Sequence, residues 1–315
     1  MLQRFKRWIA DGFVWLKKEY HHDRMKLSLR ITTLLLLVYI ILIRHTFWQP
    51  DTVLAVLLLV GVIFGKAREF VVRFVPFLVV LMIYDALRGL LYGITQRVNW
   101  WPMIDFDRWL GGGVLIGSRL QELMWHGHLE WYSFYFYILY SLHFITPILF
   151  GLILWKYRSR LYWPFVWSIL VASFLAFVTF IVFPAAPPWM AAEHGLITEP
   201  LRWISSDIWG AVGMQDSIKI VYTQISADPV AAVPSLHSIF PIVESAFIIA
   251  AFGLRRAWWI ILYPLTIFIA VVYLGEHYVF DIIVSIIYSV ITLFVVRYGF
   301  RRYRAKRSLT TEQNK

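Results

Sequence analysis

Two histidines and one aspartate have the residue types and spacing for nucleophilic chemistry. His277 and Asp281 are four residues apart, so on a helix they would share one face, one turn apart. The carboxylate could then accept a hydrogen bond from one imidazole nitrogen, which orients the ring and leaves the other nitrogen to attack. His237 begins a second apolar segment about forty residues earlier and could transfer a proton. This combination predicts a His/Asp nucleophile with a second histidine as acid and base.

Two other interpretations of these residues stay open. A histidine at a membrane interface is often a polar group near the lipid headgroups, with no chemical role. His237, His277 and Asp281 could alternatively supply three ligands to a metal ion, although no fourth ligand stands out. The chain has no cysteine, which excludes thiolate ligands, cysteine nucleophiles and disulfides. We therefore expect a reaction without a metal ion or another cofactor.

The elements that must position these residues are predicted to be transmembrane helices. The chain has 315 residues, of which 60% are hydrophobic and 16% charged, whereas a soluble domain carries about 25% charged residues. Apolar runs of roughly 20 residues, enough to cross a ~30 Å hydrocarbon core, recur along it. The sequence predicts an all-α, polytopic membrane bundle with about eight transmembrane helices, near residues 31–48, 53–65, 74–93, 131–155, 161–183, 235–253, 257–274 and 277–296. The long segments 94–130 and 184–233 are expected not to span.

Basic residues predict the orientation of this bundle. The formal net charge is +11, and Lys and Arg concentrate in the amino-terminal segment, in three short connections and in the tail after the last span. With eight spans all five clusters fall on one side, which the positive-inside rule makes cytoplasmic. Both termini are then cytoplasmic, and the histidines lie at matched depth on the extracytoplasmic side. Because membrane orientation accounts for the positions of the basic residues, no nucleic-acid partner is expected. The cell (plasma) membrane is the expected location.

Three regions follow from this topology. Residues 1–30 form a basic, amphipathic segment that suits the membrane surface. Residues 31–297 form the membrane domain, with a catalytic core at about 84–296, and residues 298–315 form a basic cytoplasmic tail.

Further polar residues fall within the apolar segments. Asp85 and Arg88 are three residues apart near the outer part of the third span. They could form a structural ion pair. Alternatively, Arg88 could bind a phosphate while Asp85 holds the Arg88 side chain in place. Glu244 lies seven residues after His237, on the same helical face and roughly 10 Å deeper. It could be a paired structural carboxylate, or it could line a substrate cavity. His143, within the fourth span, is expected to have a packed structural role.

Three short elements resemble the type-2 phosphatidic acid phosphatase (PAP2) superfamily, and within it the inositol phosphorylceramide synthase-like phosphotransferases. They are FPAAPPW at 183–189, VPSLH at 233–237 and GEHYVFD at 275–281. The second and third are specific together, in this order and topology, and the resemblance covers about residues 84–296. A PAP2-like core is therefore expected within the membrane bundle.

The resemblance implies roles for individual residues. His277 would form a phosphohistidine, Asp281 would orient it, and His237 would protonate the leaving group and then deprotonate the acceptor. Ser235, in the second element, would belong to the substrate site. The Lys and Arg-Pro motif of the classical phosphatases is not apparent, and Val271 stands where they have an arginine before the nucleophile. Arg88 is the first candidate for the phosphate-binding cation and Arg119 the second.

The expected function is transfer of a phosphoryl headgroup, phosphoinositol-like, between two lipids in the membrane. The expected partners are a lipid phosphate substrate and a lipid or alcohol acceptor. One alternative is a phosphatase that hydrolyses a phospholipid or polyprenyl phosphate, because water can replace the acceptor in the same site. A second alternative is a non-catalytic lipid binder or transporter.

Overall fold

The computed structural model describes residues 97–213 and 229–313, with a few isolated positions between 72 and 87. The chain divides into two compact units, residues 1–82 and 83–315, and every helix described below belongs to the second. The amino-terminal segment, the first two expected spans and most of the third lie outside the described residues. Asp85 and Arg88 lie there as well, so their predicted pairing stays a prediction.

The regular elements of the described residues are all helical, which confirms the all-α prediction for this part of the chain. They are α5 (Trp101–Leu110), α6 (Ile116–Met124), α7 (Trp131–Ser141), η1 (Leu142–Phe144), α8 (Thr146–Tyr157), α9 (Ser159–Val182), α10 (Pro188–Glu193), α11 (Ile204–Ala211), α13 (Leu236–Phe252), α14 (Leu254–Ala257), η3 (Trp258–Ile261), α15 (Leu262–Tyr273) and α16 (Val279–Gln313). The β-type pairing in these residues consists of isolated bridges that join Ala185 to Asn99 and to Ala231.

Several of these helices are long and apolar enough to cross a membrane. Three qualify within the described residues: α9, the continuous stretch Leu254–Tyr273, and Val279–Ala305 of α16. The pair α7 and α8 also qualifies when it is taken as one bent span, and α13 is a shorter apolar helix. These helices agree with an integral membrane protein, whereas the total of eight spans stays a prediction.

The fourth expected span, residues 131–155, is two helices that meet at an angle of 63°. Pro147 lies in the first turn of α8, where the missing N–H of proline is tolerated and its ring disfavours continuation of the preceding helix. The short 3-10 turn η1 therefore separates α7 from α8. The bend places the side chains of this turn at the start of α13, as the site below requires.

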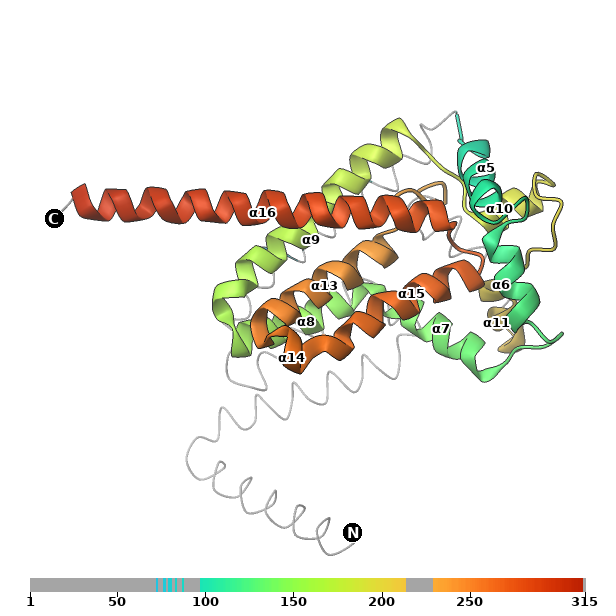
Figure 1. Cartoon of the computed structure of the whole chain (residues 1–315), viewed down its shortest axis with the longest axis horizontal. Coiled ribbons are helices and arrows are strands. Elements are labelled where there is room, and N and C mark those ends of the chain that lie inside the picture. The colour runs from blue at the N-terminus through green and yellow to red at the C-terminus, as the bar shows by residue number, and fades with distance from the viewer. Residues whose placement is uncertain are drawn as a thin grey trace, which may run out of the picture. The chain divides into compact units, whose positions relative to one another are not determined.

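Helix α13 lies at the centre of the bundle, in contact with α8, α9, α15 and α16 (Figure 1). Two buried serines allow close approach of these helices, because their hydroxyls donate to carbonyls four residues earlier in the same helix. Ser173 donates to Ile169 in α9 at 2.9 Å, and Ser289 donates to Ser285 in α16 at 2.7 Å. These two hydroxyls thus have an acceptor within their own helix and need none from lipid.

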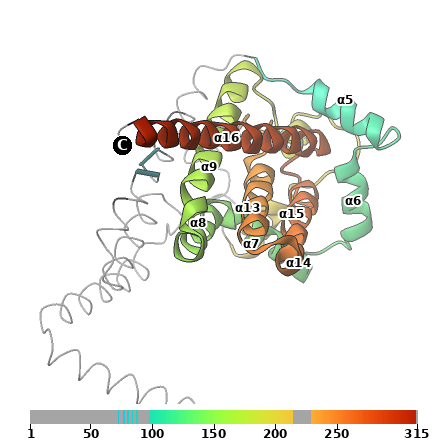
Figure 2. The same cartoon turned by 60° about the vertical axis from the view of Figure 1, so that its left-hand side comes forward.

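The segments expected not to span form short helices at one end of the bundle. Helices α5, α6, α10 and α11 contain 6 to 10 residues each, too few to cross a bilayer, which takes about 20. Figures 1 and 2 show α5 and α6 beside the beginning of α16, and α5 contacts α16 directly. This end of the molecule holds the histidines.

The last helix is longer than the sequence predicted. A span that ends near residue 296 was expected, but α16 contains 35 residues and continues to Gln313. Because an α-helix rises 1.5 Å per residue, α16 is about 52 Å long. The basic tail is therefore helical as far as the structure describes it.

Candidate active site

His277 and Asp281 are paired as the spacing predicted. Asp281 Oδ2 lies 3.0 Å from His277 Nδ1, and the aspartate side chain is completely buried. When Nδ1 carries the proton and donates it to the carboxylate, the lone pair lies on Nε2. The histidine is therefore oriented for attack through Nε2.

The backbone around this pair differs from the prediction in one respect. His277 is not on a helix, because α16 begins at Val279, and His277 ends the turn that follows α15. Asp281 bends back across the helix start, where its Oδ2 also accepts the N–H of Tyr278 at 3.0 Å. Gly275 permits this turn because its φ is +80°, and a Cβ there would lie 2.7 Å from the carbonyl oxygen of Arg202.

His237 lies beside the pair, in the first turn of α13. The ring centroids of His237 and His277 are 5.7 Å apart, so the two predicted histidines meet in one site. Tyr140 stacks on the His237 ring with a centroid distance of 4.1 Å. The ring centroid of His143 lies 4.3 Å from that of His237. Both residues come from the bent region between α7 and α8, which fixes the orientation of His237.

Ser235 links the segments that carry the two histidines. The buried hydroxyl of Ser285, in α16, donates to the Ser235 carbonyl at 3.0 Å and to the Asp281 carbonyl at 2.6 Å. The beginning of α13 is thereby held against the first turns of α16. The Ser235 hydroxyl has no hydrogen-bond partner among the described residues and is buried.

Asp107, in α5, caps the beginning of α16 from another helix. Its carboxylate oxygens accept the N–H groups of Val279 at 3.2 Å and Phe280 at 3.0 Å. Burial raises the pKa of the Asp107 carboxyl to about 6, and the charge of Asp281 acts in the same direction, whereas the two backbone hydrogen bonds oppose the change. The sequence analysis missed this residue, because a single acid in an interfacial segment has no spacing that relates it to residue 279.

The turn before His277 is fixed by a second set of contacts. Glu276 accepts a hydrogen bond from the indole N–H of Trp203 at 2.9 Å, and Trp203 stacks on Trp189 with a centroid distance of 4.1 Å. The amide of Gln121 donates to the carbonyls of Tyr273 at 2.7 Å and Arg202 at 2.9 Å. These segments therefore form the scaffold around the turn that carries His277.

Of the two predicted phosphate-binding cations, Arg88 lies outside the described residues. Arg119 is exposed on α6, with its guanidinium close to Gly112. Arg108, in α5, is an arginine that the sequence analysis did not select. It binds Glu199 through two hydrogen bonds, of 2.8 and 2.6 Å, and this contact lowers the pKa of Glu199 to about 2. Arg108 is thus committed to a scaffold ion pair.

His143 and Glu244 extend from His237 into the bundle. The His143 ring stacks on Phe240 with a centroid distance of 4.6 Å, one turn of α13 below His237. Glu244 is completely buried a further turn below. The hydroxyls of Thr146 and Tyr263, which are 3.3 Å apart, lie next to its carboxyl. The contacts of His143 agree with the packed role that was expected and add direct contact with a site histidine.

No group of three or more His, Asp or Glu side chains within the described ranges is arranged to hold a metal ion. The reaction without a metal ion stays a prediction, because Asp85 and its neighbours lie outside these ranges.

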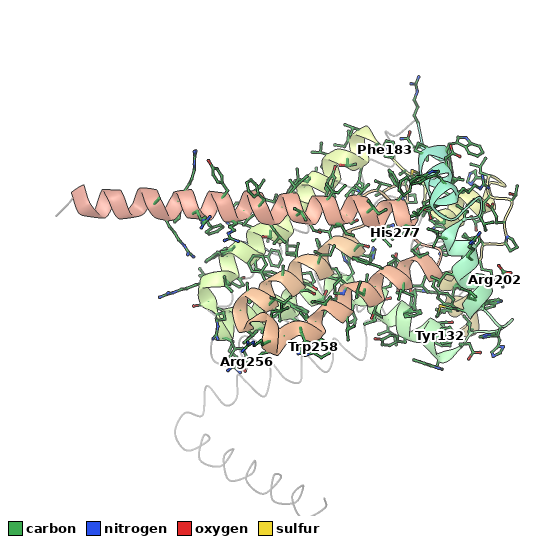
Figure 3. All side chains as sticks on the ribbon, in the orientation of Figure 1. Tyr132, Phe183, Arg202, Arg256, Trp258 and His277 are labelled. Atoms are coloured by element: carbon green, nitrogen blue, oxygen red, sulfur yellow. The ribbon has the colours of Figure 1, made fainter. Side chains whose placement is uncertain are left out.

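The site and two of the basic connections lie at opposite ends of the helices. Arg158, in the connection between α8 and α9, donates to the carbonyl of Ala251 at 2.8 Å, so it meets the end of α13, close to α14, which carries Arg255 and Arg256. Figure 3 shows Arg256 at one end of the bundle and His277 at the other. The predicted separation of the cytoplasmic basic residues from the histidines is therefore compatible with the fold.

Comparison with known proteins identifies the family. The model of the PAP2 superfamily matches residues 101–295, which include α5, the bent α7–α8 pair, both site histidines and Asp281. The chain belongs to the PAP2 superfamily, and the resemblance predicted from the three sequence elements is confirmed.

A more particular similarity supports the predicted branch. The phosphoinositol dihydroceramide synthase of Bacteroides thetaiotaomicron is 30% identical to this chain over 172 residues, which cover 52% of this chain and 55% of that protein. The chain thus spans about half of the length of this relative. No solved structure matches the chain significantly.

Proposed function

We propose that this protein is a membrane-embedded phosphotransferase that moves a phosphoinositol-like headgroup between two lipids. The observation that carries the proposal is the His277–Asp281 pair, with 3.0 Å between Nδ1 and Oδ2, beside the His237 ring at 5.7 Å between centroids. Membership in the PAP2 superfamily supports chemistry on a lipid phosphate, and the similarity to the Bacteroides synthase favours transfer of a phosphoinositol group.

The first step forms a covalent intermediate. Nε2 of His277 attacks the phosphorus of the donor phosphodiester, and the bond between phosphorus and the donor lipid oxygen breaks. His237 gives its proton to that oxygen, which leaves as a lipid alcohol. Asp281 accepts the hydrogen bond from the Nδ1–H of His277 throughout, and its charge stabilises the positive charge that develops on the ring.

The second step transfers the headgroup to the acceptor. His237, now neutral, takes the proton from the acceptor hydroxyl, whose oxygen attacks the phosphorus in line with His277 Nε2. The bond between nitrogen and phosphorus breaks, and both histidines return to their starting states. Water in place of the acceptor alcohol would give hydrolysis, so a phosphatase is the second candidate function. The basic connections at the opposite end of the bundle favour a site that faces the extracytoplasmic side.

The test is covalent labelling by a donor whose headgroup carries the label. We expect acid-labile label on the wild-type protein after rapid quench, and none on His277→Ala. His237→Ala should turn over slowly with a lipid leaving group but be much less impaired with a nitrophenyl leaving group, which departs without protonation. Label that persists in His277→Ala would assign the nucleophile to another residue. A protein that transports the lipid without label or bond cleavage would be a non-catalytic binder.

A further inference from the structure

The beginning of α16 lacks a cap of its own. The first backbone N–H groups of any helix have no partner within the helix, and Ser, Thr, Asp or Asn usually precedes them. Here Tyr278 occupies the capping position, and its ring cannot accept these bonds. Asp281, in the first turn, bends back to the N–H of Tyr278, and the N–H groups of Val279 and Phe280 are left to another residue.

Asp107, in α5 and 172 residues before Val279, is the residue that accepts these two N–H groups. Its two oxygens each accept one of the two N–H groups, and its side chain is only 1% exposed. Asp281 and Asp107 together therefore define the rotation of the first turn of α16. That rotation decides whether the Asp281 carboxylate reaches Nδ1 of His277.

We propose that Asp107 is a positioning residue for the reaction, which holds the first turn of α16 so that Asp281 meets His277. This rests on the proposed function, in which the His277–Asp281 pair attacks the phosphate. The hydrogen bonds of Asp107 go to the backbone of α16, so it acts through Asp281 and is not itself a catalytic group. The three PAP2-like elements, at 183–189, 233–237 and 275–281, do not include it.

The charges around Asp107 make its capping of α16 depend on pH. Asp281, in α16, and Tyr278, just before that helix, face it, and Arg108, its neighbour on α5, pairs with Glu199. Because its pKa is raised to about 6, Asp107 is ionised at neutral pH and accepts both N–H groups. Below that pH it gains a proton, loses one of its two acceptor atoms and loses the charge that favours a helix N-terminus.

Helix α5 offers a matched control, Asp105. It is two residues from Asp107 on the same helix and is exposed. Asp107→Asn and Asp105→Asn therefore remove the same charge from the same helix, but only the first changes the cap. Asparagine is isosteric with aspartate, so Asp107→Asn keeps the packing and one acceptor oxygen.

The experiment measures backbone exchange and chemistry separately, on the full chain in lipid nanodiscs. Amide hydrogen exchange in the peptide that contains residues 278–280 should be about fivefold to tenfold faster in Asp107→Asn than in wild type near pH 7, and unchanged in Asp105→Asn. The rate at which labelled donor phosphorylates His277 should fall about tenfold in Asp107→Asn near pH 7. The ratio of the wild-type rate to the variant rate should shrink towards one near pH 5, where Asp107 is protonated.

The outcomes separate this inference from the proposed function. Unchanged exchange in Asp107→Asn, or a rate ratio that stays the same between these two pH values, would overturn the role of Asp107. Equal effects of Asp105→Asn would overturn it as well, because they would show a general effect of charge on α5. If wild type never carries label, the proposed function fails, and the exchange measurement still decides whether Asp107 holds the beginning of α16.

Discussion

Asp281→Asn is the substitution whose effect follows most directly from the structure. One oxygen of Asp281, Oδ2, lies 3.0 Å from both His277 Nδ1 and the N–H of Tyr278. A hydrogen bond to a charged group contributes about 1.5–3 kcal/mol, and each 1.36 kcal/mol changes a rate about tenfold. Asparagine keeps one acceptor oxygen, but its NH2 group can donate to Nδ1, which stabilises the tautomer whose Nε2 is protonated and cannot attack.

We therefore expect phosphohistidine formation to slow by about 10²-fold or more, with the helical fold retained. The assay is rapid-quench labelling with a large excess of donor, so that the first step is observed alone. Asp207→Asn is the matched control, because Asp207 is also paired, with Arg202 at 3.1 Å, but belongs to α11, which carries none of the proposed catalytic residues. A first step within about threefold of wild type would refute the assignment of Asp281 as the residue that orients the nucleophile.

The remaining predictions concern topology, cations and stability. Cysteines introduced at Ala192 and at Arg255 should label from opposite sides of the membrane, and labelling of both from outside would contradict the predicted orientation. Arg88→Lys keeps the charge but loses the bidentate geometry, so activity should fall about tenfold or more; near-normal turnover of Arg88→Ala would remove this residue from the phosphate site. EDTA should leave turnover intact, whereas loss with EDTA and recovery with a divalent ion would show a metal requirement. Because Arg108 lowers the pKa of Glu199 to about 2, this pair stabilises the fold fully above the ordinary glutamate pKa and loses its effect as the pH falls towards about 2. Glu199→Gln should therefore lower stability by about 1 kcal/mol at neutral pH, after allowance for the partial exposure of Arg108, and thermal unfolding of variant and wild type should converge near pH 2–3.

The sequence predicted the core of the site because its residues are close along the chain or share a helix end. Four residues separate His277 from Asp281, and the geometry of one turn brings them together even though His277 precedes the helix. His237 was associated with them through the predicted topology, in which both apolar segments begin at the same side of the membrane. Hydropathy and the position of Lys and Arg are regular enough to support that inference.

The contacts that hold the site could not be predicted in the same way. The Asp107–Phe280 and Gln121–Tyr273 hydrogen bonds join residues more than 150 positions apart, and no periodicity relates such pairs. Pro147 indicates a break between α7 and α8, because proline disfavours continuation of the preceding helix. Hydropathy does not detect this break, since residues 131–155 form one largely apolar run. The continuation of α16 past residue 296 was missed for a related reason, because hydropathy marks where the membrane ends and not where the helix ends.

The length of α16 has a practical consequence for experimental structure determination. The helix runs unbroken from the turn of His277 to Gln313, and its length of about 52 Å exceeds the ~30 Å hydrocarbon core by several turns. A small membrane protein of 315 residues offers few features for particle alignment in electron cryomicroscopy. A helical fusion partner joined in register to the end of α16 would provide a rigid fiducial. It would lie at the opposite end of α16 from the turn of His277.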